Sequence, residues 1–318
     1  MSTARLHSAS RPHAWVILLL VISTAWWTGC ETLEVDPFTP EVVVESYQIA
    51  EKPMGEVRLS RSVDINERFV FEEQAISGAD VVIHRLDDDG AVMHTYRLLE
   101  DTPGVYRVEE ENEPAVEPLT RYRLEASIPE TGEEISSETL VPGSFELLSV
   151  SADTATFRDV QPTLSLTRSS YPDRQAVYVF STEAIDLAEE NLTPFYRGIF
   201  DNNGNLEDLR IANSGLLNEA NFPLAGDGTV NIDLPWIAIA FYGLNRIFVS
   251  AVDDNYFDFV RSQDAQQGGP GFSPGEIPNV LDNVDGGTGL FASLAQVETD
   301  IIIRCNPDVD SRCPTEEP

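Results

Sequence analysis

Hydrophobic and polar residues alternate with a period of two along much of the chain after residue 41. The segment 121–128 is a clear case, with apolar side chains at four even positions: Tyr122, Leu124, Ala126 and Ile128. Arginine, glutamate and serine stand between them. Because successive side chains of a strand point to opposite faces, this pattern predicts a strand with one buried and one hydrated face.

Six segments of this kind, separated by turn signals, precede residue 130. They read VVVESYQI (42–49), EVRLSRSV (56–63), ADVVIHRL (79–86), AVMHTYRLL (91–99), GVYRVEE (104–110) and RYRLEASI (121–128). The Asp-Gly pair in DDDG at 87–90 predicts a hairpin turn. We expect these strands to form a β-sandwich over residues 41–143.

Residues 144–304 predict a second, larger β-rich domain. Its candidate strands are PTLSLT (162–167), AVYVFS (176–181), FYRGIF (195–200), TVNIDLPWIAIAFYG (229–243) and NRIFVSAV (245–252). GLFASLAQVETDIIIR at 289–304 predicts a strand pair or one long bent strand. The expected fold is therefore all-β, with an N-terminal sandwich followed by a β-rich domain that holds one or two short helices.

One helix is expected after residue 253. Asp253 or Asp254 is a suitable N-cap, and the residues that would share a face are Tyr256, Phe259, Val260 and Gln263. Gly268, Gly269 and Pro270 would end the helix.

The first 29 residues have the features of a secretory signal peptide. They contain Arg5 and Arg11, no acidic residue, and the apolar run AWVILLLVI at 14–22. A membrane-spanning helix needs about 20 predominantly apolar residues, and serine and threonine interrupt this run after residue 22. The signal peptide is therefore the better interpretation.

The sequence Thr28-Gly29-Cys30 resembles the lipobox of bacterial lipoproteins, although Trp27 stands where that motif prefers leucine. We expect cleavage before Cys30 and attachment of lipid to its sulfur, so that acyl chains hold the protein to a membrane. The alternative is a plain secreted protein. Residues 30–40, which contain two prolines, would form a tether between lipid and fold.

Cys305 and Cys313 remain if Cys30 carries lipid. An even pair of cysteines in an exported protein predicts a disulfide, which would close the tail at residues 305–318. A metal site with two cysteine ligands is the alternative, but no histidine lies near them in the sequence.

The net charge is −34, and removal of Arg5 and Arg11 with the signal peptide would make it −36. This charge repels nucleic acid and anionic lipid, so nucleic acid is not an expected partner. Lys52 is the only lysine. A large acidic excess with almost no lysine is typical of adaptation to high salt, with a calcium-binding surface as the competing explanation.

Candidate catalytic residues are few, and the expectation is a protein that is not an enzyme and uses no cofactor. His84 and His94 flank the 87–90 turn and would face each other in one register, which could hold a metal, but solvent-facing strand positions are the better interpretation. DNNGNLED at 201–208 lacks the glycine and glutamate of a calcium loop, which favours a hairpin turn. In DGGTG at 285–289, backbone geometry explains the glycines more simply than an anion site.

The order of several segments resembles a family known as domain of unknown function 4249, which comprises outer-membrane lipoproteins of Bacteroidota and relatives. The similar segments are VVVES, GADVVIHRLDDDG, GVYRV, RYRLEA, LPWIAIAFYG, DDNYFDFVRSQ and SPGEIPNVLDNVDGGTGLFAS. The genes of that family commonly neighbour TonB-dependent receptors. The resemblance therefore implies an outer-membrane location and an accessory role beside such a receptor, and it supplies no catalytic residue. It also implies that the sandwich at residues 41–143 is of transthyretin-like or immunoglobulin-like type.

These observations favour a lipid-anchored binding or accessory module for a TonB-dependent transporter, with a structural or adhesive envelope lipoprotein as the alternative. We expect the partner-binding surface in the C-terminal region, where aromatic residues and a glycine-rich loop at 268–289 are concentrated. The candidate residues are Trp236, Tyr242, Tyr256, Phe257 and Phe272.

Overall fold

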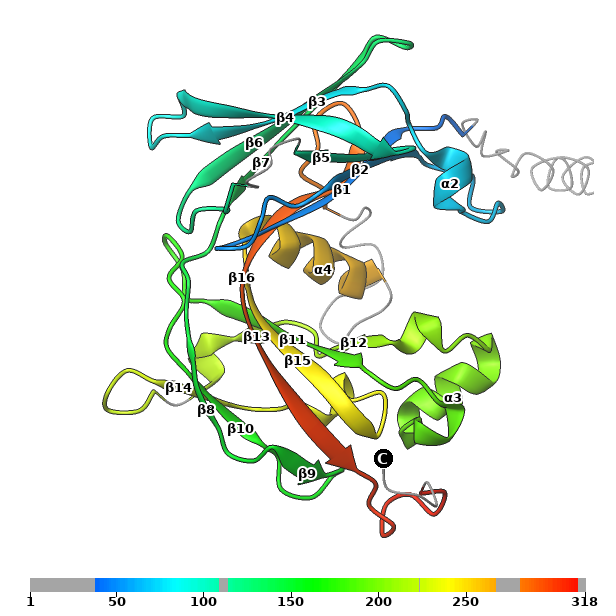
Figure 1. The fold of residues 1–318 in the computed structure, drawn as a ribbon, viewed down its shortest axis with the longest axis vertical. Coiled ribbons are helices and arrows are strands. Elements are labelled where there is room, and N and C mark those ends of the chain that lie inside the picture. Colours follow the sequence, from blue (N-terminus) through cyan, green and yellow to red (C-terminus); the bar gives the residue numbers. More distant parts are fainter. Residues whose placement is uncertain (1–37, 109–113, 223, 267–280, 314–318) are drawn as a thin grey trace, which may run out of the picture. The chain divides into compact units, whose positions relative to one another are not determined.

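The computed structural model describes residues 38–108, 114–222, 224–266 and 281–313 (Figure 1). Among the described residues, β-strands are far more extensive than helices, which confirms the predicted all-β class. The predicted signal peptide, Cys30 and Phe272 lie outside the described residues. Among the helices that are described, none is long and apolar enough to cross a membrane.

The first half of the chain supplies seven strands and one short helix, α2 (Phe71–Gln74). The strands are β1 (Val42–Ile49), β2 (Val57–Arg61), β3 (Asp80–Leu86), β4 (Val92–Thr102), β5 (Val105–Val108), β6 (Arg121–Ile128) and β7 (Glu133–Leu140). All six segments predicted as strands before residue 130 are strands. The 87–90 turn joins β3 to β4 as predicted, with Asp87 Oδ1 accepting from Ala91 N–H at 2.8 Å.

The second half contains nine strands: β8 (Leu147–Val150), β9 (Thr154–Thr156), β10 (Thr163–Leu166), β11 (Val177–Ala184), β12 (Ile211–Asn213), β13 (Leu217–Asn218), β14 (Val230–Asp233), β15 (Gly243–Val252) and β16 (Thr288–Arg304). It also holds α3 (Pro194–Asn203), α4 (Asp254–Gln266) and the 3₁₀ turns η1 (Glu189–Asn191), η2 (Glu207–Leu209), η3 (Glu219–Asn221) and η4 (Trp236–Ala238). Strands β14, β10 and β8 form a small sheet of their own.

The other strands form one 13-stranded sheet whose main path runs β12-β11-β15-β16-β1-β2-β5-β4-β3-β6-β7. The long strand β16 is central to it, and it is a single strand of 17 residues, one of the two forms predicted. Its first half pairs in parallel with β1, and its second half pairs antiparallel with β15. The sheet is therefore continuous across the predicted domain boundary at residues 143 and 144, and residues 40–318 form one compact unit.

The largest hydrophobic core is also shared by the two halves. It contains buried side chains from both, among them Leu59, Tyr122, Leu164, Phe180 and Phe291, each at most 1% exposed. The alternation predicted for residues 121–128 is present, since every apolar position of β6 is buried and every polar position is half-buried or exposed. The period-two pattern therefore identifies the core-facing side of β6 correctly.

One segment predicted as a strand is helical, and TVNIDLPWIAIAFYG begins with β14 as predicted but leaves the strand conformation after Asp233. FYRGIF lies in α3 (Pro194–Asn203), which is capped by Gly204, a left-handed residue whose N–H bonds to Phe200 O at 2.7 Å. Tyr196, Ile199 and Phe200 have the three-to-four-residue spacing of a helix face, and they pack on a separate small core. LPWIAIAFYG forms η4 and an isolated bridge between Leu192 and Phe241.

The predicted hairpin turn at 201–208 is also wrong, because residues 201–203 are the last turn of α3 and residues 207–209 form η2. The helix predicted after residue 253 is correct. Asp253 caps α4, since its Oδ1 accepts from Tyr256 N–H at 2.9 Å. The glycines and proline predicted to end this helix lie outside the described residues.

Candidate functional site

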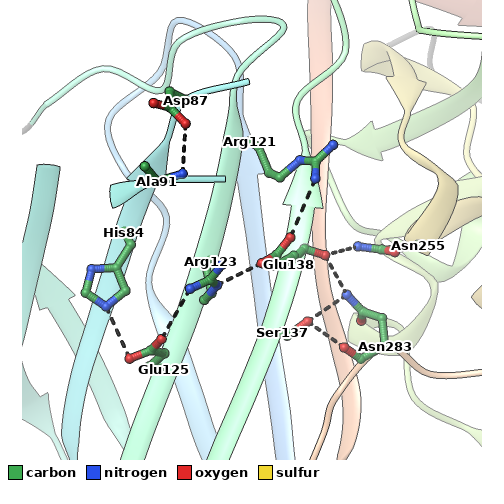
Figure 2. A network of polar contacts seen from close by, with 10 residues as sticks. All are labelled: His84, Asp87, Ala91, Arg121, Arg123, Glu125, Ser137, Glu138, Asn255 and Asn283. Atoms are coloured by element: carbon green, nitrogen blue, oxygen red, sulfur yellow. Dashed lines mark hydrogen bonds and ion pairs between the residues drawn. The ribbon is translucent and has the colours of Figure 1, made fainter. Parts of the chain in front are cut away.

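A ladder of charged side chains crosses the hydrated face of β3, β6 and β7 (Figure 2). The register places His84 opposite Arg123, and Arg123 opposite Glu138. Glu125 lies 3.3 Å from His84 Nε2, and Arg123 Nε donates to Glu138 Oε1 at 2.7 Å. Arg121 Nη1 is 3.9 Å from the same glutamate. Alternating charge thus links the three strands across this face.

A pocket of about 590 Å³ lies beside this ladder. Its wall includes Val82 of β3, Ser127 of β6, Ser136 of β7 and several carboxylates. The four carboxylates that line it are Asp80, Glu125, Glu134 and Asp285.

Glu125 is the only one of these four acids with an ion-pair partner in the described part of the chain. Asp80, Glu134 and Asp285 are exposed and face the opening without a cation. Acidic side chains in this arrangement attract a positively charged group and accept hydrogen bonds from N–H or O–H donors.

The segment 285–289 closes one side of the pocket by lying against the edge strand β7. Ser136 and Asp285 exchange backbone hydrogen bonds of 3.0 and 2.8 Å. Gly286 has φ +82°, and a Cβ there would lie 2.1 Å from Glu134 O. A Cβ at Gly289 would lie 2.1 Å from Val44 O of β1. The prediction that backbone geometry requires these glycines is confirmed.

Two asparagine side chains cover the outer edge of β7 (Figure 2). Asn255 of α4 and Asn283 donate to Glu138 O at 2.7 and 3.2 Å, and both also donate to Phe291 O of β16. Asn283 donates in addition to Ser137 Oγ at 2.7 Å. An edge strand with free backbone groups is prone to unwanted pairing, so these contacts protect β7 while they connect it to β16 and α4.

Asp253 lies buried at the same place, with 1% of its surface exposed. Its Oδ2 accepts from Thr139 Oγ1 of β7 at 2.6 Å, and Ser293 Oγ of β16 is 2.6 Å from the same threonine oxygen. Burial raises the pKa of Asp253 to about 7, against the lowering effect of the hydrogen bonds from Thr139 and from Tyr256 N–H. We call Asp253, Asn255, Asn283 and segment 285–289 the junction.

The C-terminal tail forms a second buried polar cluster. Cys305 and Cys313 are bonded to each other, as predicted. The loop between them carries Asp310, whose carboxylate accepts from Arg197 Nη2 of α3 at 2.9 Å and from Tyr242 O–H at 3.1 Å. Arg197 is 6% exposed and Asp310 is 4% exposed. The disulfide loop therefore places Asp310 in a buried ion pair with Arg197 of α3.

Of the five aromatic residues predicted to bind a partner, the four that the structure describes do not form one surface. Tyr242 is 1% exposed, so its assignment to a partner-binding surface is wrong. Its hydroxyl donates to Asp310, and its ring packs on Phe157. Trp236 is half-buried and also contacts Phe157. Tyr256 and Phe257 are half-buried on α4, where Tyr256 contacts the edge of Tyr47.

The two histidines of β3 and β4 are not opposite each other. His84 pairs with Thr95, and His94 pairs with Arg85. His84 is half-buried between Thr95 and Glu125, whereas His94 is exposed and stacks against Tyr96. No group of three metal-binding side chains occurs in the described ranges.

Sequence reasoning missed the pocket and the burial of Asp253 and Asp310. The sequence around Asp310 is typical of a turn and does not indicate that this residue is buried. The one signal for a buried acidic partner was Arg197, an arginine within the apolar segment FYRGIF. Asp253 was identified as a helix cap, but its burial depends on β7 and β16, which are distant in the sequence.

In a comparison with known families, the family model described as "Domain of unknown function (DUF4249)" matches residues 31–300. No curated protein matches the sequence.

Among solved structures, an Escherichia coli alpha-2-macroglobulin activated by porcine elastase is similar at 13% identity and a TM-score of 0.21, over 80% of this chain and 22% of that chain. A Salmonella alpha-2-macroglobulin reacted with methylamine is similar at 11% identity and a TM-score of 0.23, over 83% of this chain and 15% of that chain. The chain thus spans less than a quarter of the length of these proteins.

Proposed function

This chain belongs to the DUF4249 family, and we propose that it is a non-enzymatic, lipid-anchored protein of the outer membrane that acts as a binding or accessory module for a TonB-dependent transporter. Lipid on Cys30 is the proposed anchor, and residues 30–40 are the proposed tether. The observation that carries the binding role is the pocket on the hydrated face of β3, β6 and β7.

The proposed pocket partner is a basic segment of an envelope protein. Three carboxylates without a cation line the opening, and Val82 adds a small apolar contact. An arginine or lysine side chain that enters the pocket would provide the missing positive charge and would displace little apolar surface. Because these acids are exposed, the attraction would be strongest at low ionic strength.

The residues that most often do chemistry have structural partners in this chain, which supports a binding role. His84 lies between Thr95 and Glu125, Asp253 caps α4, and Asp310 pairs with Arg197. Each of these groups makes contacts within the fold.

A structural or adhesive envelope role is the second candidate, and the continuous strand β16 favours it. This strand joins β1 to β15 and gives the two halves of the chain a common sheet and a common core. Such a body would serve as a rigid spacer on a membrane.

Charge reversal in the pocket separates the two roles. The full-length protein would carry Glu134→Lys and Asp285→Lys, and a control would carry Glu72→Lys and Glu73→Lys, two exposed acids of α2 with the same change in charge. We expect the pocket variant to lose co-purification with the transporter, the control to retain it, and the wild-type complex to weaken as salt rises. A pocket variant that retains the transporter as well as the control does would favour the structural role.

The anchor has its own test. Replacement of Cys30 by serine would remove the lipid acceptor, and we expect the protein to leave the membrane fraction or to remain uncleaved. A Cys30→Ser protein that is processed normally and still fractionates with the outer membrane would overturn the lipoprotein proposal, whatever the outcome in the pocket.

A further inference from the structure

Asp253 lies where β7, β16 and α4 meet. It follows β15 directly and is the last residue before α4. Its backbone N–H bonds to Ser293 O of β16 at 3.1 Å, and its backbone oxygen accepts from Phe257 N–H at 3.2 Å. The residue is therefore held on both sides, and its side chain is 1% exposed.

The carboxyl group is linked to a short chain of hydroxyls. Oδ2 lies 2.6 Å from Thr139 Oγ1, and that oxygen lies 2.6 Å from Ser293 Oγ. With the carboxylate charged, Thr139 O–H donates to Oδ2. With the carboxyl protonated, its O–H donates to Thr139, which then donates to Ser293. Oδ1 accepts from Tyr256 N–H in both states. Protonation therefore reverses the direction of this chain and keeps its hydrogen bonds.

The charged groups around Asp253 do not neutralise it. From α4, Asp254 is the next acid, and Arg174 is committed to it, with Nε 2.6 Å from Asp254 Oδ1. Arg174 also donates to Val252 O and stacks on the Tyr171 ring. Tyr171 O–H in turn accepts from Asp254 N–H at 3.3 Å and is uncharged at neutral pH, since burial raises its pKa.

The β7 side adds no cation either. Glu138, next to Thr139, is exposed and pairs with Arg123 and Arg121. The residue that β16 contributes is Ser293, which is uncharged. Within the described residues, Asp253 thus has no cationic partner. Hydroxyls, one backbone N–H group and the N-terminal dipole of α4 stabilise its negative charge.

We propose that Asp253 is a proton-controlled latch, which fastens α4 to β7 and β16 more tightly when its carboxyl group is protonated. In the closed state a charged carboxylate is kept from water without a cation, which is costly, whereas the neutral acid keeps the same contacts. When the N-terminal turn of α4 opens, water reaches the group, and its charged form is no longer penalised. Acid therefore favours the closed state, and base favours opening.

The size of the effect follows from the two proton affinities. Burial raises the pKa of Asp253 to about 7 in the closed state, whereas an open, hydrated aspartate keeps its ordinary value. Since the closed state holds the proton more tightly, the ratio of closed to open molecules rises as pH falls through 7. Between pH 8 and pH 6 the increase is about tenfold.

Amide hydrogen exchange of the full chain tests the latch. The readout is the protection of residues 256–260 between pH 8 and pH 6, after correction for the intrinsic pH dependence of exchange. We expect about a tenfold gain in the wild type. Asp253→Asn keeps an acceptor for Tyr256 N–H and is permanently neutral, so its protection should not change over this range. Helix α3, whose buried partner Asp310 stays ionised in this window, is the internal control.

Two outcomes would overturn the proposal. One is a wild-type α4 whose protection is constant or decreases as pH falls from 8 to 6, which needs no variant to be folded. The other is an equal gain in Asp253→Asn, which would place the titrating group elsewhere. Thr139→Val supplies a further check, since it removes the first hydroxyl and keeps the carboxyl: the pH-dependent gain should persist, with its midpoint moved to higher pH.

Discussion

The junction and the tail each bury an aspartate, yet the two carboxylates behave in opposite ways. Asp253 is 1% exposed and Asp310 is 4% exposed. Asp253 is bound by hydroxyls and a backbone N–H, whereas Asp310 is bound by Arg197, by Tyr242 and by Arg312 N–H. Burial raises the pKa of Asp253 to about 7. Burial acts in the same direction on Asp310, but the hydrogen bond from Arg197 and those from Arg312 N–H and Tyr242 outweigh it, so its pKa is lowered.

The difference shows that the partner, more than the depth of burial, decides what a buried carboxylate does. With a guanidinium in place, the ionised form is retained and an ion pair fastens the tail. With hydroxyls alone, the ionised form is penalised, and the contact becomes sensitive to protons in the neutral range. One site is thus a permanent attachment, and the other is adjustable.

The largest predicted effect concerns the permanent attachment. Replacing Arg197 by leucine would leave Asp310 buried without its cation, and removal of one partner from a buried pair costs about 3 to 5 kcal/mol. Unfolding in urea would measure the loss. The double variant Arg197→Leu with Asp310→Leu removes the stranded charge and should recover a large part of the stability. If it is as unstable as the single variant, the ion pair is not the source of the effect.

A glycine in the junction gives the next largest effect. Gly286→Ala would place a methyl group 2.1 Å from Glu134 O at a residue with φ +82°, so β7 would have to move away from segment 285–289. Overpacking and a left-handed alanine together cost about 3 kcal/mol. Gly78→Ala is the matched control: its φ is +72°, but nothing lies within 4 Å of the added carbon.

The control should lose only about 1 kcal/mol, the cost of the backbone conformation alone. Thermal or urea unfolding of the two variants would give the difference. Equal losses in both would mean that the close approach to β7 is unimportant and that the junction tolerates a wider spacing.

The disulfide comes third. Cys305 and Cys313 are eight residues apart, and closing so short a loop contributes about 2 to 3 kcal/mol in the chain-entropy model. The double variant Cys305→Ser with Cys313→Ser should lose this amount, because Asp310 must then be positioned without the covalent constraint. In the double variant Arg197→Leu with Asp310→Leu, the same change should cost less stability, because the loop no longer has to position Asp310 in an ion pair. An undiminished cost there would separate the disulfide from the ion pair.

Much of the fold could be predicted from local pattern. Strands such as β6 show a strict alternation, Asp-Gly marks the β3–β4 turn, and Asp253 precedes an amphipathic helix. The disulfide was predicted from the even pair of cysteines that remains in an exported protein once Cys30 is assigned to lipid. In each case the signal lies within a few residues and reflects a single physical requirement, either one-sided burial, a tight turn or a free helix end.

The candidate site could not be predicted in the same way because it depends on distant contacts. β1 pairs with β16 across more than 240 positions of sequence, and segment 285–289 forms one wall of a pocket whose other walls are β3, β6 and β7. FYRGIF is ambiguous between strand and helix, since a short apolar run does not reveal its period. That ambiguity concealed Arg197, and with it the role of Asp310.

The smallest predicted effect is the most direct test of the comparison, because the two carboxylates should respond to pH with opposite signs. The pKa of Asp253 is raised in the folded protein, so folding takes up a proton and stability increases as pH falls through 7. The pKa of Asp310 is lowered, so its contribution is complete at neutral pH and is lost only as pH falls below the ordinary aspartate value of 3.8.

Between pH 8 and pH 6 only Asp253 of this pair titrates, and the expected gain in the free energy of unfolding is about 1 kcal/mol. The useful quantity is the difference between wild type and Asp253→Asn, measured by urea unfolding at each pH, because contributions common to the two proteins cancel in it. That difference should shift in favour of the wild type by about 1 kcal/mol from pH 8 to pH 6 and should not depend on Asp310. A difference that stays constant across the window would mean that folding does not change the proton affinity of Asp253 between pH 8 and pH 6, and the contrast with Asp310 would then be lost in this range.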